Sequence, residues 1–399
     1  MTFEHFKGNN ELQMIAQKIQ EAGGKAFLVG GCVRDAIFGV QSKDIDVEVF
    51  NIQKEPLLAI LKLFGKVDNV GESFEVIKLT TETQDFDFSF PRREIKVGLG
   101  HKGFQTEADP FMEPKEAAKR RDFTINALML DIATLEIFDF FGGLEDLRKR
   151  VLKHTSEAFA EDPLRVLRAM QFASRFNMDL HPETIELCKK LKSEFSTISK
   201  ERIWTEFEKM FSKGVLPSKG IKVLFETKWA DCFEAIHETF VDKSDPIFEL
   251  DIAFHLHKSV VVGIASLCSG SDEIEKFLNQ INAPNEIVRK VTELLAIFNI
   301  IDDDDRDDTD DEFIKVAVGL NKKFCSLKEL GAFLLSPEIM FFDESEMKAK
   351  ITGEDLMKFG WDPKSHKKAF GDELERLLKL QLKMNLSKEE LVEHINKPF

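Results

Sequence analysis

Residues 28–49 read LVGGCVRDAIFGVQSKDIDVEV, and this stretch decides the fold of the first part of the chain. A short apolar strand over Ala26–Val29 ends at Gly30-Gly31, and a helical turn over Cys32–Phe38 follows. A glycine turn between a strand and a helix lets backbone N–H groups approach a bound anion. Arg34 adds a guanidinium that can bind phosphate oxygens. The pattern therefore predicts a phosphate-binding corner.

Two carboxylates, Asp44 and Asp46, lie two residues apart on the strand that follows. Residues i and i+2 of a strand point to the same face, where close carboxylates repel each other unless a cation lies between them. A divalent metal held in this way can activate an attacking hydroxyl and hold a triphosphate. A later strand over residues 85–88 offers Asp87 as a third carboxylate, with Asp85 less favoured. A solvated strand edge is the alternative for an isolated Asp-x-Asp.

The apolar spacing outside this stretch predicts an α+β domain followed by helices. It predicts helices over 11–22 and Leu57–Phe64, strands over Phe74–Leu79, Phe86–Phe90 and Leu135–Phe138, and a helical segment after Asp122. Residues 91–118 are rich in Gly, Pro and charge, which predicts a long mobile loop. From about residue 144 onward only helical patterns occur. Asp162-Pro163 opens one of these helices with an acidic cap and a proline.

The composition is that of an ordinary soluble protein, with 43% hydrophobic and 32% charged residues among 399. No apolar run approaches the roughly 18 residues that span a bilayer, and residues 1–10 lack a secretory apolar core. The five cysteines are scattered without a CxxC pair, which argues against a disulfide framework or a zinc site. We therefore expect a cytoplasmic protein that does not contact membranes.

The net charge of −16 is unfavourable for tight nonspecific RNA binding. The charge is unevenly distributed. Of the three segments 1–150, 151–220 and 221–399, only 151–220 is net basic, with 12 basic and 10 acidic side chains. Residues 302–311 are almost wholly acidic, and we expect a solvated loop between helices there.

The motifs resemble those of one family. Gly30-Gly31-x-x-Arg34-Asp35 with Asp44-x-Asp46 resembles the signature of the class II tRNA nucleotidyltransferase and poly(A) polymerase family, within the polymerase β superfamily. Later segments match that family in order: 120–128 (RRDFTINAL), 139–144 (DFFGGL), 161–165 (EDPLR) with Arg168, and 201–203 (ERI). The resemblance covers roughly residues 26–211, and residues 352–356 (TGEDL) resemble a tail segment of these enzymes.

The resemblance implies a polymerase β-like nucleotidyltransferase head with a small mixed sheet, followed by an elongated all-helical neck, body and tail. The expected domains are a catalytic head over residues 1–143, a neck that selects the nucleotide over 144–215, and a tRNA-binding body and tail over 216–399. Two Mg²⁺ ions are expected on Asp44 and Asp46, with Asp87 as the third catalytic carboxylate.

The resemblance also implies the nucleotide-binding residues. Gly30, Gly31 and Arg34 are expected at the phosphates, and Arg120, Arg121 and Asp122 are expected to contact the triphosphate and the ribose hydroxyl, with Asn126 bracing their turn. His101, in the expected loop, is not expected to be catalytic.

Asp162 and Arg165 lie three residues apart, so they share a helix face. A carboxylate accepts from an exocyclic amino group and a guanidinium donates to a ring nitrogen, so the pair matches cytosine and adenine and rejects uracil and guanine. The resemblance implies that this pair replaces a nucleic-acid template, with Arg168 near the bound nucleotide. A surface ion pair is the alternative.

These expectations define an enzyme that adds C, C and A to the 3′ end of tRNA from CTP and ATP and releases pyrophosphate. A CC-adding or A-adding enzyme and a poly(A) polymerase share the same head and stay open. A non-catalytic RNA-binding protein, and a helical scaffold over residues 221–399, are the alternatives from other classes.

Overall fold

The computed structural model describes residues 3–40, 45–70, 76–96, 104–241, 245–301, 318, 323–335, 337–340, 348–384 and 386–398. The chain divides into two compact units. The first unit comprises Met1–Met210 with Gly214–Cys232, and the second comprises Phe211–Lys213 with Phe233–Phe399. Asp44, His101 and the acidic run at 302–311 lie outside the described residues.

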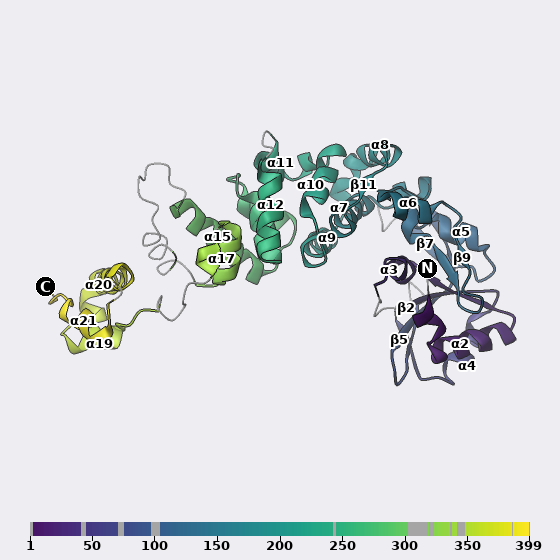
Figure 1. The fold of residues 1–399 in the computed structure, drawn as a ribbon, viewed down its shortest axis with the longest axis horizontal. Coiled ribbons are helices and arrows are strands. Elements are labelled where there is room, and N and C mark those ends of the chain that lie inside the picture. Colours follow the sequence, from purple (N-terminus) through teal and green to yellow (C-terminus); the bar gives the residue numbers. More distant parts are fainter. Residues whose placement is uncertain are drawn as a thin grey trace. The chain divides into compact units, whose positions relative to one another are not determined.

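A seven-stranded mixed sheet organises residues 25–138 of the first unit, in the order β3-β4-β5-β2-β1-β8-β9. Figure 1 labels β2, β5 and β9 of this sheet. The strands are β1 (Lys25–Val29), β2 (Ile45–Phe50), β3 (Lys66–Val70), β4 (Val76–Thr80), β5 (Asp85–Ser89), β8 (Met129–Asp131) and β9 (Ile137–Phe138). Only β2 and β5 pair in parallel, and the other neighbours are antiparallel. The expected α+β head with a mixed sheet is confirmed.

Alternation along β2 separates its two faces. Val47 and Val49 are fully buried on one face, whereas Asp46 and Glu48 lie on the other. The second face continues into an apolar cluster that includes Phe27 and Phe50, against which the alanines of α5 (Pro114–Lys119) pack. The acidic positions of β2 are therefore held at the border of a core.

The head has further short helices around the sheet: α1 (Glu4–Lys7), α2 (Asn10–Glu21), α3 (Gly31–Ile37), α4 (Lys54–Leu61) and the 3₁₀ turn η2 (Thr124–Asn126). α2 begins where the Asn9 side chain accepts from the Leu12 N–H at 3.0 Å. It then buries Leu12, Ile15 and Ile19 at helical spacing, and packs on β1 and α4.

The prediction of one long loop over residues 91–118 is wrong, because much of this segment forms strands and a helix. β6 (Arg92–Lys96) and β7 (Phe104–Ala108) form an antiparallel pair, and α5 begins with Pro114 at its first turn. Strand pairing is made by backbone hydrogen bonds, so charged residues do not prevent it. Proline at the first helical turn is a helix-start signal.

The helical segment expected after Asp122 is also wrong. Only the three-residue η2 forms there, and the chain then enters β8. A short apolar run does not distinguish a helix from a strand that is buried on both faces. Leu128, Met129 and Leu130 are all buried, as such a strand requires. β3 was not anticipated at all.

Helices make up most of the first unit after the sheet. They are α6 (Gly143–Lys149), α7 (Leu164–Phe176), α8 (Pro182–Lys190), α9 (Lys200–Ser212) and α10 (Pro217–Glu226), with 3₁₀ turns η3 (Glu157–Glu161), η4 (Leu191–Thr197) and η5 (Ala230–Cys232). Two-residue strands β10 (Val151–Leu152) and β11 (Asp179–Leu180) pair in parallel, a small departure from the expected helix-only pattern. α9 continues into the first residues of the second unit.

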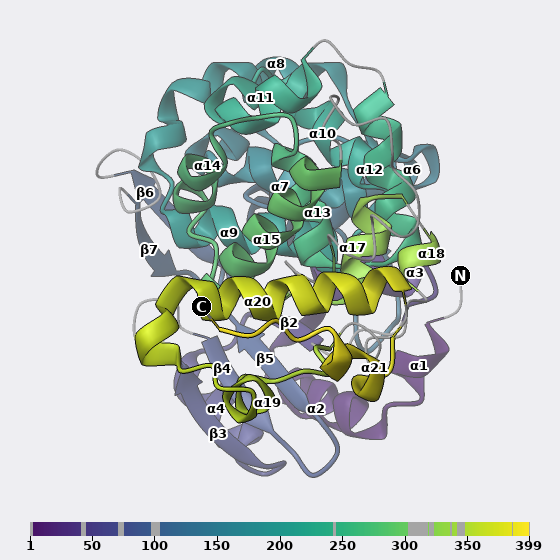
Figure 2. The same cartoon turned by 90° about the vertical axis from the view of Figure 1, so that its left-hand side faces the viewer.

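The described secondary structure of the second unit is helical: α11 (Glu234–Phe240), α12 (Asp245–Leu256), α13 (Val260–Cys268), α14 (Ile274–Gln280), α15 (Asn285–Ile301), α17 (Leu327–Phe333), α18 (Pro337–Met340), α19 (Gly353–Lys358), α20 (Pro363–Met384) and α21 (Lys388–Glu393). α20, drawn in yellow in Figure 2, is kinked at Lys367, whose φ of 37° and ψ of −110° are not helical. A buried apolar cluster near the end of the chain comprises Ile351, Leu356, Trp361, Leu377 and Leu391. None of the described helices is both long enough and apolar enough to cross a membrane.

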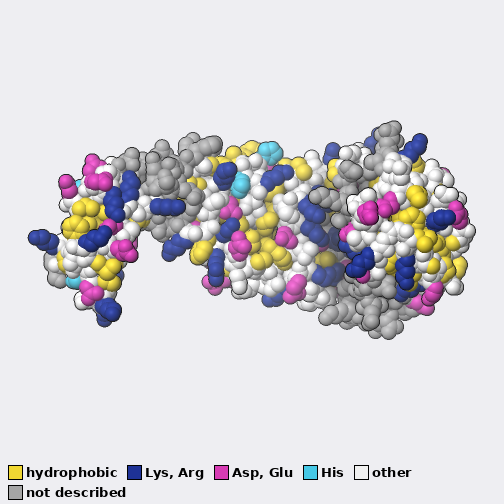
Figure 3. Space-filling model, turned by 90° about the horizontal axis from the view of Figure 1, so that it is seen from below, with side chains coloured by type: hydrophobic (Ala, Val, Ile, Leu, Met, Phe, Trp, Pro, Cys, Tyr) yellow, Lys and Arg dark blue, Asp and Glu magenta, His cyan; other side chains and the backbone are white. Residues whose placement is uncertain are grey.

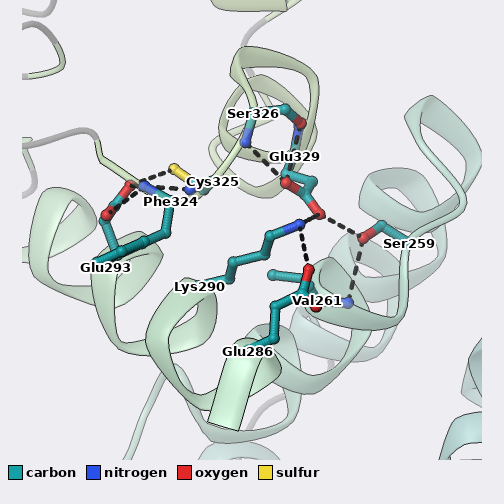
Figure 4. Close-up of polar contacts among 9 residues, drawn as sticks. All are labelled: Ser259, Val261, Glu286, Lys290, Glu293, Phe324, Cys325, Ser326 and Glu329. Carbon is teal, nitrogen blue, oxygen red and sulfur yellow. Dashed lines mark hydrogen bonds and ion pairs between the residues drawn. The ribbon is translucent and has the colours of Figure 1, made fainter. Parts of the chain in front are cut away.

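Polar contacts fix the start of α17 beside α15 (Figure 4). Ser326 and Glu329 form a reciprocal capping box. The other oxygen of Glu329 accepts from Ser259 Oγ at 3.2 Å and lies 3.7 Å from Lys290 Nζ. On α15, the Glu293 carboxylate accepts from the backbone N–H groups of residues 323–325 at 2.8–3.0 Å.

Candidate active site

The glycine turn lies between β1 and α3. Gly30 has a φ of +70°, a conformation that favours glycine. A Cβ built on Gly30 would lie 3.5 Å from Arg121 Nη1. The structure therefore brings the turn and Arg121, which are about 90 residues apart in sequence, into contact distance.

Two of the expected catalytic carboxylates lie on neighbouring strands. Asp46 of β2 is the direct register partner of Asp87 in the parallel pair with β5. Adjacent strands lie about 4.8 Å apart, and register partners of a parallel pair point to the same face. Asp46 is exposed and Asp87 half-buried, whereas Asp85 pairs with Lys78 at 2.9 Å. Exposed carboxylate oxygens on one face suit Mg²⁺, which prefers oxygen ligands.

Asp122 is the centre of a buried polar network. Its Oδ1 accepts from Asn126 Nδ2 at 2.9 Å and from the Phe123 N–H, and its Oδ2 pairs with Arg168 at 2.7 Å. Burial raises the pKa of Asp122, but the charge of Arg168 and the Asn126 hydrogen bond outweigh it, so the pKa lies below the usual range. Asn126 is thus hydrogen-bonded to Asp122 at this turn, and its expected place in the nucleotide site stays a prediction.

Arg34 is almost fully buried, and other side chains surround its guanidinium. It donates to Asp35 Oδ1 through two nitrogens at 2.6 and 2.8 Å, and to Asn126 Oδ1 at 2.5 Å. It also stacks on Phe176 of α7, with 4.5 Å to the ring centroid. Burial lowers the pKa of Arg34. These contacts tie α3 to α7, and the direct phosphate contact expected of Arg34 stays a prediction.

The Asp162 carboxylate caps α7 and contacts α9. Its Oδ1 accepts from the Leu164 N–H at 3.1 Å, which is the expected acidic cap, and its Oδ2 pairs with Arg202 at 2.6 Å. Arg165 donates to the backbone oxygens of Ala158 and Arg120 at 2.6 and 2.9 Å. The helix expected to select the nucleotide is therefore bonded directly to the arginine segment at Arg120.

Sequence reasoning missed three residues of this cluster. Arg175 pairs with Asp35 Oδ2 at 3.1 Å, Phe176 stacks on Arg34, and Glu48 pairs with Arg120 at 3.0 Å. Glu48 alone had a signal in the sequence, since it continues the alternation of Asp44 and Asp46. Figure 3 shows several Lys and Arg side chains lying close together on the face of the molecule that it draws.

The fold and these residues define the head as that of a nucleotidyltransferase. A family model described as "Poly A polymerase head domain" matches residues 26–153, and one described as "Probable RNA and SrmB-binding site of polymerase A" matches residues 177–238. Residues 26–153 and 177–238 therefore belong to the nucleotidyltransferase head and the RNA-binding domain of the class II CCA-adding enzyme and poly(A) polymerase family.

Curated relatives match about half of the chain. The chain is 36% identical over 208 residues to the multifunctional CCA protein of Xanthomonas campestris, covering 51% of this chain and 49% of the relative. It is 40% identical over 190 residues to that of Pasteurella multocida, covering 46% and 43%. The chain thus spans about half the length of the curated relatives it matches.

Solved structures share the fold over nearly the whole chain. The Thermotoga maritima CCA-adding enzyme, complexed with tRNA, superimposes with a TM-score of 0.68 at 21% identity, covering 98% of this chain and 95% of that one. The Bacillus stearothermophilus CCA-adding enzyme, in complex with CTP, gives 0.69 at 22%, covering 96% and 97%. At such identities the likeness shows the fold.

Proposed function

We propose that the chain adds C, C and A to the 3′ end of tRNA, using CTP and ATP and releasing pyrophosphate. The observation that carries this is the register of Asp46 and Asp87, which lie on one face of the sheet. The glycine turn follows β1 of the same sheet, and Arg121 lies beside that turn. The names of the relatives support it, since the curated relatives are CCA proteins and the solved enzymes were captured with tRNA or CTP.

In the proposed reaction, the terminal 3′-hydroxyl oxygen attacks the α-phosphorus of CTP or ATP. The new P–O bond forms as the bond from the α-phosphorus to the oxygen that bridges it to the β-phosphate breaks, so pyrophosphate leaves and the hydroxyl proton is released to solvent. Asp44, Asp46 and Asp87 would hold Mg²⁺, which supplies activation of the hydroxyl and neutralises charge on the triphosphate. The chain's own part is positioning and charge stabilisation by fixed groups.

The remaining expected residues have roles in this proposal. Arg121, which lies beside Gly30, and Arg120 would bind the triphosphate, and Asp122 would contact the ribose hydroxyl. Asp162 and Arg165 select the base. Since Asp162 pairs with Arg202, the carboxylate is held in a fixed orientation before a nucleotide arrives. We also propose the division into a head (1–143), a neck (144–215) and a tRNA-binding body and tail (216–399).

The test is nucleotide addition to a tRNA transcript that lacks its last three bases. With CTP alone we expect two added residues, and with CTP and ATP together three. A product that stops at two residues with both triphosphates identifies a CC-adding enzyme, whereas addition of A only to a transcript ending in CC identifies an A-adding enzyme. Long extension with ATP alone identifies a poly(A) polymerase, and no extension under any condition contradicts the catalytic proposal.

A further inference from the structure

Glu48 is a buried acidic residue to which the proposed reaction gives no role. It is 1% exposed and lies two residues beyond Asp46 on the same face of β2. One oxygen, Oε1, lies 3.0 Å from Arg120 Nη2 and 3.6 Å from Arg121 Nη2. The other oxygen, Oε2, is buried without a hydrogen-bond partner.

Stability of the fold does not explain an acidic residue here. Glu48 lies directly across from Phe27 of β1, which is 1% exposed and belongs to the apolar cluster under α5. Burying a carboxylate costs free energy, and an oxygen left without a partner adds to that cost. An apolar side chain is often at least as stabilising in such a place. The benefit of Glu48 must therefore lie in what it holds.

Glu48 holds two arginines beside the glycine turn. Arg121 lies against Gly30, and the backbone oxygen of Arg120 accepts from Arg165 of the nucleotide-selecting helix. Burial and, to a smaller extent, repulsion from Arg121 lower the pKa of Arg120 to about 10, although the charge of Glu48 opposes this shift. One carboxylate thus keeps two like charges side by side.

We propose that Glu48 is a positioning residue that pre-orients Arg120 and Arg121 for the triphosphate of the incoming nucleotide. This inference rests on the proposed function, since the triphosphate is the ligand of that site. A guanidinium has five N–H donors, so a carboxylate on one terminal nitrogen does not exclude a phosphate on the others. The rigid β2 strand that carries Asp46 therefore also sets the position of the phosphate-binding arginines.

The substitution E48Q tests this, because glutamine keeps the size of the side chain and removes its charge. The arginines then have to be ordered by the nucleotide itself, and that cost weakens binding. We expect the KM for CTP to rise about tenfold while kcat stays within about threefold. E48V replaces the carboxylate with the apolar side chain that a buried strand favours. We expect it to raise the KM for CTP as E48Q does. The control E21Q removes a carboxylate from an exposed pair with Lys18 in the same domain and leaves KM unchanged.

Calorimetric titration of each folded protein with CTP separates this inference from the proposed reaction. Weaker CTP binding by E48Q supports the positioning role even if the wild type adds no nucleotide. Unchanged CTP affinity and unchanged KM in E48Q, with or without a lower melting temperature, overturn the positioning role while nucleotide addition stands.

Discussion

Two sets of acidic residues, one in each unit, show opposite uses of a carboxylate. In the second unit, both oxygens of Glu293 and both of Glu329 have partners within the contacts that fix the start of α17 (Figure 4). In the first unit, Asp46 is exposed and Glu48 keeps a buried oxygen without a partner. Carboxylates whose buried oxygens all have partners stabilise a fold, whereas a buried carboxylate oxygen without a partner, such as Glu48 Oε2, needs another explanation, for which binding is a candidate.

The largest effect is expected at Asp46. The substitution D46N removes the charge of a proposed metal ligand and keeps its shape, so we expect nucleotide addition to fall by on the order of 10²–10³-fold or more. The melting temperature should stay close to that of the wild type, because the side chain is exposed. Activity is measured on truncated tRNA at saturating Mg²⁺. If D46N retained that activity, Asp46 would not be a metal ligand in the reaction.

A smaller effect is expected in the second unit, and on a different quantity. S326A removes the hydroxyl that accepts from the Glu329 N–H at 3.1 Å, so the free energy of unfolding should fall by about 1 kcal/mol. T352A does the same to the capping box of α19 and serves as the matched variant. Urea unfolding followed by circular dichroism measures both, and the KM for CTP should not change. A changed KM for CTP would contradict the view that the capping contacts of the second unit serve stability alone.

Local patterns in the sequence predicted the elements that carry the site. The glycine turn predicted the join of β1 and α3, strict alternation predicted β2, and Asp162-Pro163 predicted the cap of α7. Each of these signals depends on neighbours in sequence. The same reasoning failed for β6 and β7, because strands rich in charged residues can still pair through backbone hydrogen bonds. It also failed for β8, because a short apolar run that is buried on both faces resembles a helix segment.

The contacts that build the site are non-local, and no single-sequence pattern contains them. The register of Asp46 with Asp87 depends on strand pairing, and Glu48 reaches Arg120 across 72 residues. The residue type of Arg34 predicted a cation, but only the fold shows its guanidinium held by Asp35 and Asn126. The metal, phosphate and base-selecting roles stay predictions.

The smallest effect should appear as a pH dependence at Glu293. Burial raises the pKa of Glu293, but hydrogen bonds from the Cys325 thiol and three backbone N–H groups outweigh it, so its folded-state pKa lies below the ordinary value. A lowered pKa contributes stability above the unfolded-state pKa, about 4.3 for Glu, and that stability is lost as the pH falls through the folded-state pKa. E293Q should therefore be less stable than the wild type at pH 7, and the difference should narrow below about pH 4. Urea unfolding at several pH values measures this, and a difference that stays constant with pH would show that the hydrogen bonds at Glu293 do not depend on its charge.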